Sequence, residues 1–305
     1  LHRSESPVRM TIFRGEPMNW TNVHNLPAPL VSAILNDPYD RQGDISITGL
    51  IRSPRQRILE KRHDAEIAQD VSDRLWSLLG QSVHAILERA DTTNHLSEER
   101  LGAELHGWKI TGKPDLLTPE MIIQDYKVTS VYSFLLGEKR EWEEQLNLYA
   151  WLYRQHGFNA VGLQIVAILR DWMANRAAHE PDYPQAGFIV RPVPLWSVEE
   201  QEAEIGVRVR VHQTAERVPD DVLPDCTAEE RWQREDSWAV KKKGNKRAYR
   251  VFNNGDDAVK LAADMKDTVV EYRPGESIKC LRYCVAAPFC SQFKAMERQW
   301  EGGEE

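Results

Sequence analysis

The sequence has few cysteines, no long apolar run and a deficit of positive charge. Only four of its 305 residues are cysteines. No stretch has the length and apolar character of a membrane span, and the first residues lack the pattern of a secretory signal. We therefore expect a soluble protein of the cytoplasm that has no membrane partner. The 39 lysines and arginines are outnumbered by 47 aspartates and glutamates, which gives a net charge of −8. This balance argues against a protein that coats nucleic acid without specificity.

The remaining composition is that of an ordinary folded protein. Apolar residues make up 41% of the chain and charged residues 28%, so disorder over the whole length is excluded. A chain of this length suits one large domain, or a core with a smaller lobe. The ten tryptophans are many for this length. We expect most of them in the core and some on the surface, where they can stack on bases.

Apolar patterning divides the chain into three parts. Residues 1–45 form an N-terminal arm rich in turn signals, within which residues 1–9 have no apolar period and read as a tag remnant. Residues 46–217 contain the regular patterns of a folded core. Residues 218–305 are polar and include a basic loop and a cysteine cluster. We expect the loop over 227–279 to lack the apolar residues for a core of its own.

Periodicity in the core predicts alternating helices and strands. A turn or strand leads into a basic helix over 46–62. Further helices are predicted over 70–90, 141–155 and 197–217, the last with a capping box of Ser197 and Glu200. Strands are predicted over 103–110, 113–117, 121–128, 160–170 and 187–194. This order predicts an α/β fold with a central sheet and flanking helices.

Two aspartates mark the ends of neighbouring predicted strands. Asp115 follows the tight turn at Gly112, and Asp125 ends an apolar run ten residues later. Adjacent antiparallel strands lie about 5 Å apart, so both carboxylates can converge on one hard cation.

A lysine accompanies the second aspartate. Asp125 and Lys127 are two residues apart on a strand, so their side chains share a face. Carboxylates that fix a metal, beside an amine that orients the water the metal acidifies, form a hydrolytic arrangement. The alternative is a surface ion pair at a strand edge.

Three further side chains are candidates for the same site. His84 lies on the predicted helix that precedes the strands, one turn after Gly80; alternatively, it is an ordinary core histidine. Gln145 and Tyr149 are four residues apart and share one face of the next helix. The alternative for this pair is a surface glutamine beside a half-buried tyrosine.

The cysteines are clustered near the end of the sequence. Cys280, Cys284 and Cys290 have the spacing C-x3-C-x5-C, and Cys226 lies upstream. Without a secretion signal, this clustering favours a metal or iron–sulfur site over disulfides, and unreactive buried thiols are the alternative.

A basic and aromatic stretch lies between Cys226 and Cys280. We identify it either as a contact for a DNA strand or as a solvated hairpin turn around Gly244. Its basic residues are Lys241, Lys242, Lys243, Lys246, Arg247 and Arg250, interleaved with Trp232, Trp238 and Tyr249.

Together these motifs resemble a known family. In their order and spacing, His84, Gly112-x-Pro-Asp115, Asp125-x-Lys127 and Gln145-x3-Tyr149 resemble the RecB-like branch of the PD-(D/E)XK nuclease superfamily. The cysteines resemble the iron–sulfur staple of AddB-type and CRISPR-adaptation members, and the layout resembles phage-encoded exonucleases. The resemblance implies a mixed central sheet flanked by helices, as in restriction endonucleases, with a small cysteine-stapled C-terminal lobe.

The resemblance also implies residue roles. His84, Asp115, Asp125 and the main-chain carbonyl of Tyr126 would bind Mg²⁺ or Mn²⁺. Lys127 would position the attacking water, while Gln145 and Tyr149 would orient the DNA strand. Glu104 stands where relatives often carry an acidic residue, and we rank it lower.

The cysteine pattern departs from that of the CRISPR-adaptation relatives, whose first cysteine lies in a Cys-Pro-Arg-like sequence. Here that place reads Ser53-Pro54-Arg55, so Cys226 must supply the fourth thiolate. Four thiolates suit a [4Fe–4S] cluster, which we favour, or a tetrahedral zinc ion. Whether the site clamps the N-terminal segment stays open.

The sequence analysis leads to a metal-dependent DNA nuclease, most simply an exonuclease on single strands or duplex ends. Its setting would be DNA recombination, repair or replication of a phage or mobile element, in the host cytoplasm. No G-x4-G-K-[ST] motif is present, so a separate helicase or a strand-annealing recombinase is the expected partner. The alternatives are a noncatalytic DNA-binding module and a CRISPR-type spacer-trimming nuclease.

Overall fold

The computed structural model describes residues 19–36, 42–89, 95–97, 99–135 and 139–301. The expected tag remnant and the turn signal at Asp37-Pro38 lie outside the described residues. Their contacts divide the described residues into two compact units. One unit takes residues from the ranges 1–52 and 64–217, and the other from 53–63 and 218–305.

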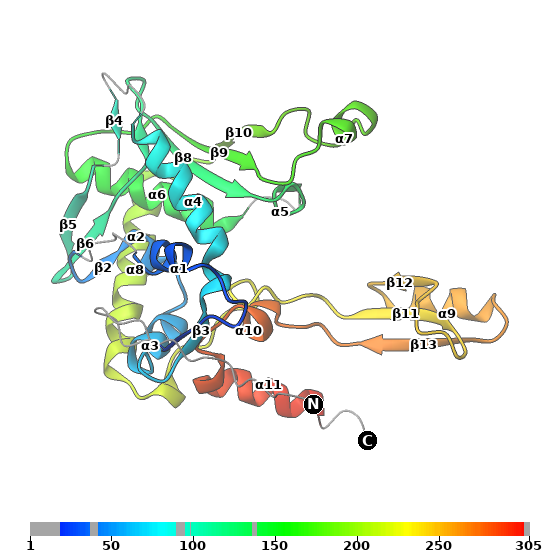
Figure 1. Ribbon diagram of the computed structural model, residues 1–305. Coiled ribbons are helices and arrows are strands. Elements are labelled where there is room, and N and C mark those ends of the chain that lie inside the picture. Colours follow the sequence, from blue (N-terminus) through cyan, green and yellow to red (C-terminus); the bar gives the residue numbers. More distant parts are fainter. Residues whose placement is uncertain (1–18, 37–41, 90–94, 98, 136–138, 302–305) are drawn as a thin grey trace. The chain divides into compact units, whose positions relative to one another are not determined.

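The first unit is built on a five-stranded mixed sheet (Figure 1). The strand order is β10-β9-β8-β7-β4, in which β8 and β9 are parallel and the other neighbours are antiparallel. The strands are β4 (Leu96–Ser97), β7 (Leu116–Leu117), β8 (Ile122–Thr129), β9 (Gly162–Leu169) and β10 (Phe188–Val193). This α/β arrangement confirms the expected fold class.

Helix α6 (Arg140–Gln155) connects the two parallel strands and packs against both. Its buried residues form a continuous run from Glu144 to Tyr153, because α8 (Val198–Arg217) covers its other side. Helix α8 begins with the expected capping box: the Glu200 carboxylate accepts the Ser197 N–H at 2.7 Å, and Ser197 Oγ accepts the Glu200 N–H at 3.2 Å.

A smaller sheet has the order β2-β6-β5. Its strands are β2 (Ile45–Ser46), β5 (Leu101–Leu105) and β6 (Trp108–Gly112). The prediction of a single strand over 103–110 was wrong. His106 and Gly107 both have positive φ, at 51° and 78°, and this two-residue turn folds the segment into a hairpin.

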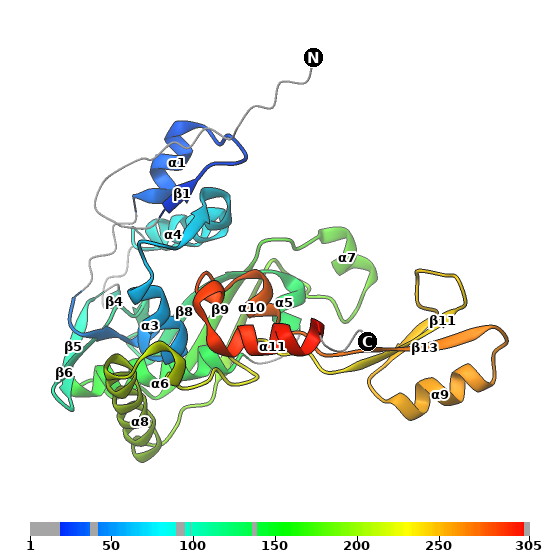
Figure 2. The same cartoon turned by 90° about the horizontal axis from the view of Figure 1, so that it is seen from below.

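The remaining elements of the first unit lie before or between these strands. Helix α4 contacts β8, and α1 packs beside η1 and α4 around Val31, Ile34 and Val71 (Figure 2). The elements are β1 (Asn19–Thr21), α1 (Ala28–Leu35), α2 (Ile47–Leu50), β3 (Ala68–Asp70), η1 (Val71–Arg74), α4 (Leu75–Leu87), α5 (Val131–Leu135) and α7 (Ala174–His179).

The second unit combines short helices with a three-stranded antiparallel sheet. Its helices are α3 (Pro54–Arg62), η2 (Asp220–Val222), α9 (Gly255–Ala263), α10 (Ile278–Arg282), η3 (Ala287–Phe289) and α11 (Ser291–Glu301). Helix α3 lies inside the range that the sequence assigned to the core, yet it groups with the second unit.

The sheet of the second unit lies in the segment that was expected to be a loop without a core. Its strand order is β12-β11-β13, formed by β11 (Ser237–Lys242), β12 (Arg250–Phe252) and β13 (Thr268–Arg273). Helix α9 lies along β11 and β13 in both views (Figures 1 and 2). Ala239, Val240 and Ala258 are fully buried, so this segment does have a small core. From here on, the arm means residues 237–273, which are distinct from the N-terminal arm of residues 1–45.

None of the described helices has both the length and the apolar character needed to cross a membrane.

Candidate functional site

The two candidate aspartates meet where β7 and β8 pair. Asp115 lies just before β7, and its Oδ2 accepts the Tyr126 N–H at 2.7 Å. Asp125 lies on β8 and is 2% exposed. The two carboxylates are close enough for the charge of Asp115 to raise the pKa of Asp125. The hairpin therefore brings together the two residues that the sequence pattern singled out.

Asp125 is a buried carboxylate without a full set of hydrogen bonds. Its Oδ2 has no partner with hydrogen-bonding geometry among the described residues, although the Lys127 ammonium lies 2.6 Å away as an ion pair. Burial raises the pKa of Asp125 to about 6, against the attraction of Lys127 and with added repulsion from Asp115. A buried oxygen of this kind fits a cation site, because a bound cation would replace the missing donors.

Lys127 links the strand to helix α6. Its Nζ donates to Gln145 Oε1 at 2.9 Å while it pairs with Asp125. Gln145 in turn donates through Nε2 to the Tyr149 hydroxyl at 3.2 Å. Gln145 and Tyr149 are both buried, and their spacing of four places them on one face of α6. The alternative of a surface glutamine is therefore wrong, and the Lys127 ammonium is held between two oxygens.

Helix α4 brings His84 to the same group. His84 Nδ1 lies 3.2 Å from Asp115 Oδ1, and the histidine is partly exposed rather than part of the core. Tyr126 is placed by its N–H bond to Asp115. Glu104 is exposed on β5, opposite Lys109 across the hairpin.

Gly112 allows α6 to approach β6 closely. A Cβ atom at this position would lie 2.8 Å from Tyr149 and 2.9 Å from Leu152, which is closer than such atoms pack. The glycine therefore sets the distance between the strand that leads to Asp115 and the helix that carries Gln145 and Tyr149.

The four cysteines line one pocket of the second unit. Its cavity volume is about 20 Å³, and α3 supplies Arg55, Gln56 and Leu59 to its wall. Burial, with added repulsion between neighbouring thiols, raises the pKa of Cys280 to about 11. Burial likewise raises the pKa of Cys226 to about 11, although a hydrogen bond with Ser53 opposes the shift. The fold thus gathers all four thiols that the sequence spacing pointed to.

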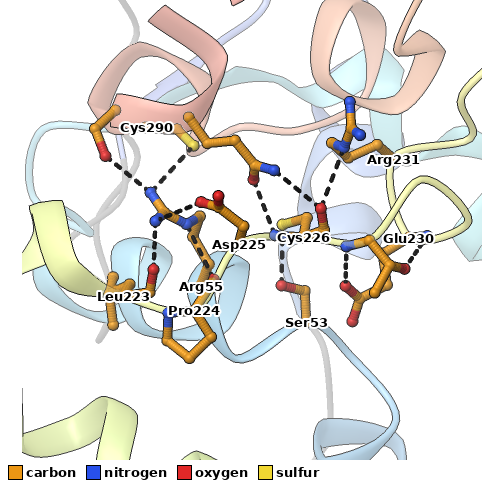
Figure 3. Close-up of polar contacts among 12 residues, drawn as sticks. Ser53, Arg55, Leu223, Pro224, Asp225, Cys226, Glu230, Arg231 and Cys290 are labelled. Atoms are coloured by element: carbon orange, nitrogen blue, oxygen red, sulfur yellow. Dashed lines mark hydrogen bonds and ion pairs between the residues drawn. The ribbon is translucent and has the colours of Figure 1, made fainter. Parts of the chain in front are cut away.

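Ser53 and Arg55 of the Ser53-Pro54-Arg55 segment contact two of the cysteines that line this pocket (Figure 3). Ser53 Oγ is 3.0 Å from Cys226 Sγ. Arg55 is 3% exposed and donates to the main-chain oxygens of Leu223 and Pro224. Its Nη1 donates to Ser291 Oγ at 2.9 Å and lies 3.9 Å from Cys290 Sγ. The N-terminal end of α3 is therefore joined to the cysteine-bearing segments by a buried cation and a hydroxyl.

As placed, these side chains are not arranged around an ion. Among the described residues, no group of three or more His, Cys, Asp or Glu side chains could hold a metal ion in its present arrangement. At the first site, His84 and Lys127 bind the carboxylates instead. At the second, four sulfur donors surround a pocket rather than a point.

The basic stretch lies on the arm. It spans the end of β11, the turn at Gly244, where φ is 82°, and the start of β12. Lys241 pairs with Glu271 across the sheet, and the Arg250 guanidinium lies 4.8 Å from the centre of the Phe252 ring. The basic stretch therefore forms a hairpin turn around Gly244.

Sequence reasoning missed one pair of residues in the first unit. The Arg170 guanidinium lies over the Trp76 ring, 4.1 Å from its centre. Trp76 lies on α4, and Arg170 directly follows β9, far along the sequence. Only the fold brings them together.

Comparison with protein families gives a match for the chain. Residues 51–291 match the PD-(D/E)XK nuclease superfamily. No protein with a curated description matches the chain.

Two solved structures are similar to parts of the chain. The structure of SSO0001 is 19% identical over 62% of this chain and 86% of that chain, with a TM-score of 0.44. A phage-related exonuclease from Haemophilus somnus 129PT is 17% identical over 46% of this chain and 70% of that chain, with a TM-score of 0.33. The superfamily match spans most of the sequence. It contains the site formed by Asp115, Asp125, Lys127 and the side chains that contact them, which we call the carboxylate group. The chain therefore belongs to the PD-(D/E)XK nuclease superfamily.

Proposed function

We propose that this protein is a metal-dependent deoxyribonuclease that acts as an exonuclease on single strands or duplex ends. One observation carries the proposal: Asp115, Asp125 and Lys127 converge at one hairpin, where Gln145 holds the lysine. A buried carboxylate that is paired with a lysine but has an incomplete set of hydrogen bonds suits a cation site better than a noncatalytic scaffold.

The residues fit a hard cation. Asp115, Asp125 and the carbonyl of Tyr126 would hold Mg²⁺ or Mn²⁺, with His84 as a further ligand. Such an ion lowers the pKa of a bound water and stabilises negative charge on a phosphate. When the ion binds, the Lys127 ammonium would lose its ion pair with Asp125 but keep its hydrogen bond to Gln145. From there the ammonium would orient the attacking water. Gln145 and Tyr149 would contact the strand beside the scissile phosphate, and cleavage would leave a 5′-phosphate.

We further propose a [4Fe–4S] cluster in the cysteine pocket, with zinc as the alternative. Thiolates around one zinc ion stand within about 4 Å of one another. In a four-iron cluster each thiolate binds a different iron, so the sulfurs stand further apart. All four thiols line one pocket, which supports a group bound by four thiolates, and the preference for the cluster over zinc rests on the resemblance of the cysteine pattern. Ser53 and Arg55 would donate to its thiolates.

The arm is the second proposed contact for DNA. Lys242, Lys243, Lys246, Arg247 and Arg250 lie around an exposed hairpin of a chain whose net charge is −8. Lys241 pairs with Glu271, so we assign it a smaller part. The absence of an ATP-binding motif supports a separate helicase or strand-annealing recombinase as partner, in recombination, repair or replication of a phage or mobile element in its host cytoplasm.

Digestion of end-labelled DNA tests the nuclease proposal. Single- and double-stranded oligonucleotides labelled at the 5′ or 3′ end are incubated with Mg²⁺, Mn²⁺ or EDTA. We expect cleavage with either metal and none with EDTA, and release of the label at the first time points identifies an end-dependent enzyme.

The matched control is Asp125→Asn, which keeps the shape of the side chain and removes its charge. We expect it to lose cleavage while its circular dichroism stays that of the wild type. Cleavage by Asp125→Asn at the wild-type rate, or no cleavage by the wild type on any of these substrates, would contradict the proposal.

A further inference from the structure

Trp76 is a large aromatic side chain on the surface of the nuclease unit. It lies on α4 and is 61% exposed. The guanidinium of Arg170, also an exposed residue, lies 4.1 Å from the centre of its ring. A cation held over a tryptophan leaves the rest of the ring available, and such rings bind unpaired bases by stacking.

The Trp76–Arg170 pair lies next to the carboxylate group. Arg170 directly follows β9, and its N–H donates to the Thr129 carbonyl at the end of β8, two residues beyond Lys127. On the other side, α4 contacts β8 and carries His84 eight residues after Trp76. At 1.5 Å per residue, the two helix positions are about 12 Å apart along the axis.

Gly80 lies midway between Trp76 and His84, one turn from each. A Cβ atom here would meet no described atom within 4 Å, whereas at Gly112 it would collide with α6. A glycine inside a helix costs about 1 kcal/mol relative to alanine, and packing within the protein gives no reason for it. Close approach of a ligand to the helix backbone is a second established reason for glycine.

Positive charges near the Trp76–Arg170 pair suit a phosphate backbone. The charges of Arg170 and Lys127 both reach Lys139, whose pKa is lowered by burial first and by these two cations as well, against the opposite effect of Glu141. Arg170, Lys127 and Lys139 are therefore near enough for their charges to act on one another, and a DNA strand would be attracted to them.

We propose that the Trp76–Arg170 pair is a stacking site for an unpaired base of the DNA substrate. The strand would pass along α4 at Gly80 and reach the carboxylate group at His84. With about 3.4 Å per stacked nucleotide, the 12 Å distance places this base roughly three to four nucleotides from the scissile phosphate. This inference rests on the proposed nuclease function and deepens it, because it makes a single-stranded segment the substrate.

A single-stranded oligonucleotide with one abasic site at successive positions tests the inference. With the wild-type protein, we expect KM for the first cleavage to rise roughly 5- to 100-fold when the abasic site is three to four nucleotides from the cut, as loss of one stacked base predicts. With Trp76→Ala, the intact substrate should show this higher KM already, and the abasic site should add nothing. Trp76→Phe should restore the dependence.

Gly80→Ala separates a contact with DNA from an effect on folding. Alanine should raise Tm, because it favours the helix, and it should weaken binding of single strands. The control is Ile86→Ala on the same helix, an exposed apolar residue beyond His84, which should leave KM and its dependence on the abasic site unchanged. An abasic effect of equal size in the wild type and in Trp76→Ala would overturn the inference, as would unchanged binding by Gly80→Ala.

Fluorescence of 2-aminopurine distinguishes this failure from a failure of the proposed function. The probe is placed at each position of an oligonucleotide bound to Lys127→Ala, a variant that we expect to bind DNA without cutting it. We expect quenching at one position of the oligonucleotide. This quenching should disappear in the double variant that carries both Lys127→Ala and Trp76→Ala. If the wild type shows no cleavage while the quenching is observed, the stacking site stands and the nuclease proposal fails. If the wild type cleaves DNA and no position is quenched, the nuclease proposal stands and the stacking site fails.

Discussion

Asp125 is the residue on which stability and function make opposite demands. It is nearly completely buried, and burial raises the pKa of its carboxyl to about 6 from the ordinary 3.8. In the folded protein without metal, the charged form is therefore disfavoured even though Lys127 lies beside it. A bound cation would reverse this balance, since it needs the charged form.

The first prediction concerns the pH dependence of the metal-free protein. The folded state holds a proton on Asp125 up to about pH 6, while the unfolded chain releases it near 3.8. The free energy of unfolding should therefore fall as pH rises between these values and level off above them. Urea denaturation in EDTA across this range measures the slope, and the slope should be smaller in Asp125→Asn. Equal slopes in the two proteins would contradict the assigned cause.

The second prediction concerns His84, whose ring nitrogen lies 3.2 Å from Asp115. Imidazole favours Mn²⁺ over Mg²⁺ as a ligand. We expect His84→Ala to raise the metal concentration needed for cleavage, more for Mn²⁺ than for Mg²⁺, with little change in DNA binding. Metal titrations of cleavage beside a binding assay without metal measure both.

His179→Ala is the matched control, because this exposed histidine bonds only to the backbone of its own helix in the described structure. A His84→Ala protein with unchanged metal dependence would make the histidine a structural partner of Asp115.

At the scale of elements, the close approach of β6 and α6 places the helix that carries Gln145 and Tyr149. Gly112 permits this approach, because a methyl group there would overlap Tyr149 and Leu152. The contact lies between a strand and a helix that are far apart in the sequence, so the reason for the glycine is invisible without the fold.

The third prediction follows from this contact. Gly112→Ala should destabilise the protein by about 1–3 kcal/mol, as overpacking does, and should lower cleavage by displacing Tyr149 from Gln145. Chemical denaturation and initial cleavage rates measure the two effects. Gly102→Ala on the neighbouring strand is the control, because its nearest contact would be an ordinary 3.4 Å to a flexible lysine. If both variants behaved alike, close packing at Gly112 would not explain the result.

The elements show where sequence patterns are reliable. Helix α6 runs from 140 to 155 and α8 from 198 to 217, so the predictions for 141–155 and 197–217 were confirmed to within one residue. Long helices with a strong period or a capping box are specified locally. The segment 103–110 was misread because its turn is only two residues long, His106 and Gly107, and no proline or asparagine marks it.

At the scale of the molecule, the cysteine-bearing segments and the arm belong to one unit together with α3. Arg55 explains why a helix from the N-terminal half groups there. Its buried guanidinium binds main-chain oxygens of Leu223 and Pro224 and pairs with the Asp225 carboxylate. Ser53 Oγ contacts Cys226 Sγ in the same unit.

The fourth prediction concerns removal of one cysteine. Cys284→Ser should lose bound iron, lower solubility and weaken DNA binding, while hydrolysis of short substrates persists because the carboxylates belong to the other unit. Iron analysis and visible absorbance after anaerobic purification measure the first effect. About four iron atoms per chain support the cluster, stoichiometric zinc in colourless protein supports the alternative, and neither metal contradicts both.

Limited proteolysis of the same variant tests where order is lost. The arm has its own buried residues, Ala239, Val240 and Ala258. It should therefore resist cleavage, while the cysteine-bearing segment 276–301 becomes sensitive. Cleavage within the arm at the same rate would mean that the arm depends on the metal, as its polar sequence first indicated.

Sequence patterns alone were enough to predict the fold class, the helices α6 and α8, and the residues gathered around Asp115 and Asp125. They could do so because local periodicity specifies helices, and because a strand places alternate residues on one face. They also grouped the cysteines by spacing alone.

The contacts that these residues make depend on the three-dimensional fold. It joined Lys127 to Gln145, His84 to Asp115, Arg170 to Trp76 and Ser53 to Cys226. It also built a folded arm from a segment that looked like a loop. Each of these contacts joins residues far apart in the chain, and their formation depends on how strands pair and helices pack, which no local pattern specifies.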